Sequence, residues 1–401
     1  MLHAADPFLL QLLVIFLWAK IFGELFERLS LPAVLGEILA GITLGPYATA
    51  LVHPSGEIEA IGQIGAIFLL FSVGLETHPS ELIGVGRSSL RVALLGVLVP
   101  FVFGFGYLML WHYPAHEAIF VGAAMVATSV GISARVMGDL HVLHTRAAKI
   151  ILAAAVFDDV LGMVLLALVA GLASTTGIQW LQLSLLFAEA VAFTVFMIFF
   201  APRVVRRMRP GLMRLYTHDA PLVLALAICL GLSVAAQKIG MAAIIGAFFA
   251  GLAFADHAPE WNLQSRVAGI TQFLSPFFFF VMGARLNLSV INWEVARVAI
   301  VISVLAILTK VVGCGVPVLH EGWRTAMKVA VGMVPRGEVG LIVALVGLNM
   351  RVITDQSYAV VIFMTGATTV FAPLILRMLF RQYPDTLPEV HMAPVQPEPA
   401  A

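Results

Sequence analysis

The hydrophobic positions of this chain fall into thirteen apolar segments, separated by short polar or charged stretches. Most approach the length of about 20 residues that a helix needs to cross the hydrocarbon core of a bilayer. Uninterrupted apolar runs of this length favour helices, because a helix satisfies its own backbone hydrogen bonds in lipid. The predicted spans are residues 8–28, 32–51, 58–76, 90–112, 116–138, 148–173, 182–202, 219–237, 241–256, 267–284, 296–319, 325–349 and 357–380.

Composition supports an all-α polytopic membrane protein. The chain is 61% hydrophobic and 11% charged, whereas about a quarter of the residues of a soluble domain are charged. The net charge of +0 gives no electrostatic case for nucleic acid. The sequence contains no phosphate-binding loop, dinucleotide fingerprint or metal-ligand cluster, so we expect neither an enzyme nor a resident cofactor. Cys229 and Cys314 lie within apolar spans and are interpreted as packing residues.

The distribution of Lys and Arg predicts the orientation of the chain. With the N-terminus outside, sixteen of these cations lie in the cytoplasmic connections and the C-terminal end, and four lie on the opposite side. Cytoplasmic loops carry the excess of positive residues in most membrane proteins. We therefore predict an outside N-terminus and a cytoplasmic C-terminus.

Similar segments recur 209 or 210 residues apart. LPAVLGEILAGI resembles MAAIIGAFFAGL, FLLFSVG resembles FFFFVMG, and MVATSVG resembles MVPRGEVG. Each repeat holds six spans, and the single span between the repeats turns the second one upside down. Inverted repeats are a transporter architecture. The predicted divisions are a first six-helix repeat (1–181), a linker helix with a basic cytoplasmic loop (182–214), an inverted second repeat (215–382) and a disordered Pro-rich tail (383–401).

Two adjacent carboxylates, Asp158 and Asp159, lie about ten residues inside the sixth span. A central Asp costs roughly 2.5–3.5 kcal/mol to insert, which favours a function over a helix cap. Neighbours on a helix differ by about 100°, so one acid can face a water-filled cavity while the other faces a protein partner. Lys310, central in its own span, is interpreted as the partner of Asp158, although a snorkelling Lys is the alternative.

Two spans contain residues that interrupt a helix. ATSVGIS places Thr128 and Ser129 in mid-span, and PRGEVG places Arg336 and Glu338 at the matching position of the second repeat. Pro removes a backbone donor and Gly weakens a helix, so both segments are predicted to unwind locally and to expose carbonyls and helix ends. Arg336 and Glu338 would form an internal ion pair that supports the fold, or would contact the substrate.

Other polar residues within the spans carry less weight at this stage. Among them are Glu37, Gln63 and Glu189. We interpret the two glutamates as groups in helix contacts rather than as ligands. The eleven His residues lie mostly in connections, where a solvated loop is favoured over a pH sensor.

Together these motifs resemble the sodium/proton exchanger family. ATSVGISARV, AAAVFDDVLG, LTKVVG and MVPRGEVGLIVA, with FLLFSVGLE, occur in the family's order, and the resemblance covers about residues 8–380. The paired Asp is similar to the electrogenic bacterial branch. The resemblance implies a dimerisation domain, a moving core domain and two crossing broken helices near the ion site. It also implies that Asp159 carries Na+ and protons, that Asp158 bridges Lys310 without Na+, and that Thr128 and Ser129 line the site.

The implied function is antiport of Na+ (or Li+) for H+ by alternating access, with two protons exchanged per Na+ for pH homeostasis. The partners would be monovalent cations, protons, the bilayer of a bacterial inner membrane and a second copy of the chain. A K+/H+ antiporter of the same fold is the nearest alternative. An ion channel or a sodium-coupled solute symporter on a similar inverted repeat is a different class of alternative, and the symporter should show more polar groups for an organic substrate near the breaks. A receptor or scaffold has little use for intramembrane charges.

Overall fold

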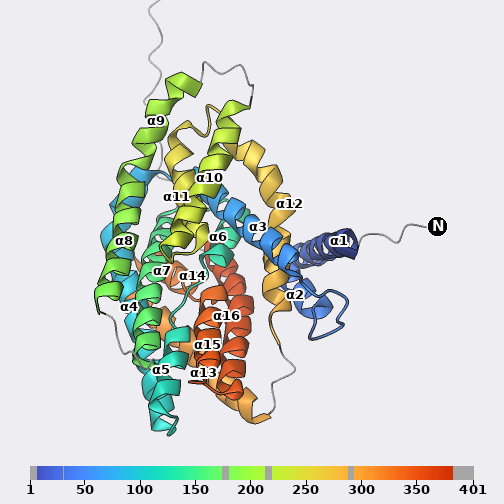
Figure 1. The fold of residues 1–401 in the computed structure, drawn as a ribbon, viewed down its shortest axis with the longest axis vertical. Coiled ribbons are helices and arrows are strands. Elements are labelled where there is room, and N and C mark those ends of the chain that lie inside the picture. Colours follow the sequence, from blue (N-terminus) through green and yellow to red (C-terminus); the bar gives the residue numbers. More distant parts are fainter. Residues whose placement is uncertain (1–6, 30, 174–179, 213–218, 288–292, 383–401) are drawn as a thin grey trace, which may run out of the picture.

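The computed structural model describes residues 7–29, 31–173, 180–212, 219–287 and 293–382 (Figure 1). This described part is helical throughout and contains no strand. Its α-helices are α1 (Pro7–Arg28), α2 (Ala33–Leu44), α3 (Gly56–Leu75), α4 (Pro79–Leu110), α5 (Ala115–Ala124), α6 (Val130–Asp139), α7 (Arg146–Ala173), α8 (Trp180–Phe199), α9 (Ala201–Leu212), α10 (Ala220–Lys238), α11 (Ala243–Phe254), α12 (Leu263–Ala284), α13 (Trp293–Gly315), α14 (Trp323–Gly332), α15 (Glu338–Asn349) and α16 (Asp355–Gln382). The predicted tail, 383–401, lies outside the described residues.

The helices are those of a multi-pass membrane protein. Eight described helices are long and apolar enough to cross a membrane, and α8 with α9, bent by 41°, makes a ninth. Shorter apolar helices include α2 and α11. The structure divides two of the expected spans, 116–138 and 325–349, into the pairs α5–α6 and α14–α15. The total of thirteen spans therefore remains a prediction.

The helices pack in two groups. Helices α1, α2, α3, α10, α11 and α12 contact mainly one another, and we call them the α3 bundle. Helices α4 to α7 and α13 to α16 form a second group, the α7 bundle. Helix α8 contacts both α7 and α11, so it touches both groups, and it runs along the left edge of the molecule in Figure 1.

Glycines allow very close helix contacts within the α3 bundle. A side chain at Gly74 of α3 would collide with the carbonyl of Phe248 in α11, and one at Gly251 of α11 would collide with the carbonyl of Phe71 in α3. Helices in lipid associate through such close packing, because burial from water gives no driving force there. Segments FLLFSVG and MAAIIGAFFAGL of the repeats therefore supply the contact surfaces between α3 and α11.

The two helix breaks contact each other inside the α7 bundle. Residues 125–129 separate α5 from α6, and residues 333–337 separate α14 from α15. The Ser129 amide donates to the Pro335 carbonyl over 2.8 Å, and the Ser133 hydroxyl donates to the Gly332 carbonyl over 2.6 Å. Each break therefore satisfies backbone groups that the other leaves without a helical partner.

Candidate ion-binding site

The two carboxylates of α7 occupy different environments. Asp158 is 2% exposed, whereas Asp159 is only partly buried and lines a cavity. Successive side chains of a helix point about 100° apart, which is why one acid faces protein and the next faces open space. The structure thus separates the pair into a buried acid and an accessible acid.

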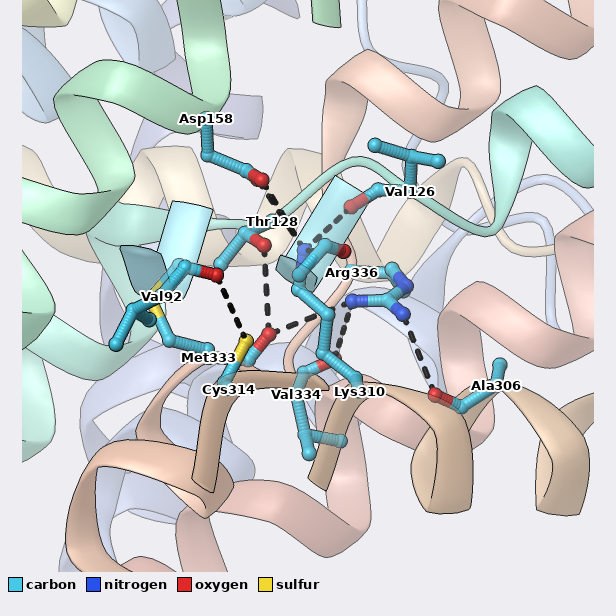
Figure 2. A network of polar contacts seen from close by, with 11 residues as sticks. Val92, Val126, Thr128, Asp158, Ala306, Lys310, Cys314, Met333, Val334 and Arg336 are labelled. Carbon is cyan, nitrogen blue, oxygen red and sulfur yellow. Dashed lines mark hydrogen bonds and ion pairs between the residues drawn. The ribbon is translucent and has the colours of Figure 1, made fainter. Parts of the chain in front are cut away.

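Lys310 of α13 lies beside the buried acid. Its Nζ is 3.2 Å from Asp158 Oδ1, and it also donates to the carbonyls of Gly96 (2.9 Å) and Val126 (2.7 Å) (Figure 2). The Lys310 side chain is fully buried, so it reaches no water and does not snorkel. Val126 belongs to the first helix break, where α5 ends. Lys310 therefore places a positive charge at the negative end of that half-helix.

Arg336 makes similar contacts at the second break, in which it lies. Its guanidinium donates to the carbonyls of Met333 (3.4 Å) and Val334 (3.1 Å), just beyond the end of α14, and to Ala306 of α13 (3.4 Å). The side chain is fully buried, and its Nε has no hydrogen-bond partner among the described residues. The side chain of Glu338, its expected partner, lies outside the described residues. The described hydrogen bonds of its guanidinium all go to backbone carbonyls.

The polar residues of the first break face the second break. Thr128 is 5% exposed, and its Oγ1 donates to the Met333 carbonyl over 3.3 Å (Figure 2). A Cβ built on Gly337 would lie 2.7 Å from Ser129 Oγ, so the Ser129 side chain packs against the second break. Both residues therefore lie at the junction of the broken helices. The hydrogen bond donated by the Thr128 hydroxyl goes to a protein carbonyl.

Asp159 lies at the bottom of a cavity of about 300 Å³ between the two bundles. On α7, the cavity is lined by residues that follow Asp159, away from the basic end of the helix at Arg146. Three of its lining side chains are polar: Gln63, Asp159 and Gln237. The others are Gly or apolar: Ala66, Gly162, Met163, Leu166, Gly240, Met241, Ala242, Ala243, Ile244, Phe278, Val339 and Ile342.

On the other side of Asp159, toward the basic end of α7, the space is nearly closed. A cavity of about 10 Å³ remains there, which is too small to form an aqueous path. Apolar side chains from both bundles fill the region: Leu70, Val130, Leu152, Ala155, Val156, Ile244, Ile245 and Phe248. Asp159 is therefore accessible from one side only.

A polar contact joins the two bundles on this closed side. Arg135 of α6 donates to Ser275 of α12 over 2.6 Å and to Asp139 over 3.1 Å, and its Nη2 lies 3.9 Å from Glu37 of α2. The Glu37 side chain is 1% exposed, and its Oε2 has no hydrogen-bond partner in the described part of the chain. Glu37 is expected to lie in a helix contact, and the contact it makes with Arg135 crosses the interface between the α3 bundle and the α7 bundle.

This arrangement suits the binding of a small cation. An accessible carboxylate lies between water and an apolar wall, close to the first turns of α6 and α15, since Val130 and Val339 line the same two cavities. Helix N-termini favour negative charge nearby. No group of three or more His, Cys, Asp or Glu suited to a tightly held metal occurs within the described residues.

The fold and this intramembrane charge cluster define an ion-transporting membrane protein, and comparison with known proteins identifies its family. The model for the sodium/hydrogen exchanger transmembrane region matches residues 13–382. The chain therefore belongs to the sodium/hydrogen exchanger family, whose members are antiporters and not enzymes.

Several bacterial relatives are similar over nearly their full length. The chain is 34% identical to the high-affinity Na+/H+ antiporter NhaS3 of Synechocystis, over 93% of this chain and 89% of that protein. It is 31% identical to the Na+/H+-K+ antiporter GerN of Bacillus cereus, over 93% and 96%. The solved structure of the sodium proton antiporter MjNhaP1 of Methanocaldococcus jannaschii shares the fold, with a TM-score of 0.62, 19% identity and coverage of 92% of this chain and 95% of that chain.

Proposed function

We propose that this protein exchanges Na+ for H+ across the membrane and that Asp159 binds the two ions alternately. The observation that carries the proposal is the asymmetry of the paired acids. Asp159 lines a cavity of about 300 Å³, while Asp158 is held by the fully buried Lys310. A single accessible carboxylate cannot hold a proton and a sodium ion at once, so competition couples the two fluxes.

The surrounding residues hold the acid in place. Lys310 donates to the Val126 carbonyl at the first break and Arg336 donates to the Val334 carbonyl at the second. The hydrogen bonds of Ser129 to Pro335 and of Thr128 to Met333 hold the two breaks against each other. The N-terminal turns of α6 and α15 would stabilise the ionised form of Asp159. Thr128 and Ser129 would supply neutral oxygens to Na+ after small local shifts, since both lie at the junction of the breaks.

Access to Asp159 would alternate between the two sides. The cavity opens away from the basic ends of the helices, which corresponds to an outward-facing state if the N-terminus is outside. A movement of the α7 bundle past the α3 bundle would close this cavity and open the small one on the inner side. With one proton on Asp159 and one on the Asp158–Lys310 pair, two protons would enter for each Na+ expelled. One net charge would then move inward, driven by about 2.3 kcal/mol per 100 mV.

The two halves of the chain are proposed to be inverted repeats within thirteen spans. Helix α5 begins at Ala115 and α14 at Trp323, 208 residues later, and both are followed by a break and a second half-helix. The close glycine contacts also correspond between the two halves. The contacts between α2 and α12 have the same arrangement as the contacts between α11 and α3. This correspondence supports the predicted divisions at 1–181, 182–214 and 215–382. We further propose a homodimer in a bacterial inner membrane, which the family resemblance implies, with a cytoplasmic C-terminus, which the distribution of Lys and Arg predicts.

Exchange in proteoliposomes tests the proposal. A sodium gradient should drive a proton flux that an internal pH dye reports, and Asp159→Asn should abolish it. Asp355→Asn, an exposed acid in the first turn of α16, is the matched control and should retain the flux. Wild-type exchange by the Asp159→Asn variant would refute the assignment of the carrier.

Potassium is the second candidate cation. GerN, at 31% identity, is named an Na+/H+-K+ antiporter, and the Asp159 carboxylate attracts K+ and Na+ alike because the two ions carry the same charge. The same liposomes with a potassium gradient separate the cases. A flux with potassium and none with sodium would change the substrate while leaving the site unchanged.

A further inference from the structure

One face of α3 lines the whole open path between the bundles. Glu59, Gln63, Ala66 and Leu70 are spaced by four, three and four residues, so they lie on one side of the helix. Glu59 and Gln63 line an outer cavity of about 30 Å³, Gln63 and Ala66 line the cavity of about 300 Å³, and Leu70 lines the small closed space beyond Asp159. Gln63 therefore stands where the two outer cavities meet.

A second glutamine lies on another wall of the larger cavity. Gln237 belongs to the last turn of α10, next to the turn at Gly240 that leads to α11. The side chains of Gln63 and Gln237 are both exposed, and neither forms a side-chain hydrogen bond to the described protein. Their amide oxygens are thus available in a cavity whose remaining lining, apart from Asp159, offers no polar side chain.

The outer end of the path carries charge but no free acid. Glu59 pairs with Arg285 at the end of α12 over 3.0 Å, and both side chains are partly exposed. A cation entering or leaving here meets a neutralised pair first and Asp159 last. Among the side chains that line the cavity between these two points, only the two amides can replace water molecules lost from the ion's hydration shell.

We propose that Gln63 and Gln237 form a neutral cation-binding position on the outer path, where a partly dehydrated Na+ pauses between water and Asp159. Both residues belong to the α3 bundle, whereas Asp159 belongs to the α7 bundle. The position therefore faces Asp159 only in the open arrangement seen here. Neutral amide oxygens bind the ion weakly enough for it to leave, which conduction through successive positions requires.

The proposal rests on Na+/H+ exchange at Asp159 and makes a prediction specific to one side of the membrane. Na+ presented from the outer side passes the glutamines, whereas Na+ presented from the inner side reaches Asp159 after the outer cavity has closed. Gln63→Met keeps the length of the side chain and removes its oxygen. It should raise the KM for outer Na+ about 3- to 10-fold, the effect of losing one neutral polar contact, and leave the KM for inner Na+ unchanged.

Right-side-out and inside-out membrane vesicles measure the two KM values separately. Gln237→Met should give a similar one-sided effect. Gln63→Glu keeps a side-chain oxygen, so its outer KM should equal the wild-type value or lie below it. Gln272→Leu, an exposed glutamine of α12 outside the cavity lining, is the matched control. An unchanged outer KM in both methionine variants, or an equal rise on both sides, overturns the proposal while wild-type exchange stands. No sodium-dependent flux in wild-type vesicles would instead refute the proposed exchange itself.

Discussion

Removing the charge of Lys310 should destabilise the protein strongly, and removing the charge of Asp158 as well should reverse much of the effect. Lys310→Met keeps the volume of the side chain but leaves Asp158, 2% exposed, without its cation. The same change removes two donated hydrogen bonds, to the carbonyls of Gly96 and Val126. Breaking a buried pair by removing one partner typically costs about 3–5 kcal/mol, because an uncompensated charge stays buried.

The double variant Asp158→Asn/Lys310→Met separates the lost charge balance from the lost hydrogen bonds. It no longer buries an unpaired charge, so we expect it to regain more than half of the stability lost by Lys310→Met. Thermal unfolding of the purified protein in detergent, followed by tryptophan fluorescence, gives the comparison. If the double variant is as unstable as the sum of the two single variants, Asp158 and Lys310 act independently and the reasoning fails.

Three further changes test other parts of the structure. Glu117→Met should cost about 1–3 kcal/mol of stability in the same melting assay, because Glu117 Oε1 accepts from both the amide and the hydroxyl of Thr354 and Met leaves both donors unpaired; an unchanged melting temperature would contradict this. Gly74→Val should lower the yield of folded protein, since overpacking against the Phe248 carbonyl costs about 1–3 kcal/mol or more, and normal yield would argue against the close contact. Arg135→Met should weaken the contact between the bundles on the closed side and raise the labelling rate of a cysteine placed there; a slower rate would refute that role.

The sequence alone predicts the helical class and the buried charges well. Apolar runs of this length leave few alternatives to membrane helices, and Asp158, Asp159 and Lys310 stand out because charge is costly in lipid. The helix breaks were also predictable, since Pro335 and the small residues of ATSVGIS weaken a helix locally. Both breaks occur in the structure, at residues 125–129 and 333–337.

The sequence could not predict which polar groups meet across the bundles. The pairing of Arg336 with Glu338 stays a prediction, because the Glu338 side chain lies outside the described residues, whereas the bonds of the Arg336 guanidinium to carbonyls at a helix break depend on the packed structure. Glu37 and Gln63 looked minor because a single polar residue in a span carries little signal. Their positions at the bundle interface and in the cavity depend on how two distant groups of helices pack, which local patterns do not encode.

The central claim is that Na+ and protons compete for Asp159, and proton release on sodium binding measures this most directly. Purified protein in weakly buffered detergent solution is titrated with NaCl while a pH dye reports released protons, with choline chloride as the salt control. The wild type should release protons, with apparent Na+ affinity falling as the solution becomes more acidic. Asp159→Asn should release none and Asp355→Asn should match the wild type. Undiminished release from Asp159→Asn would contradict the account.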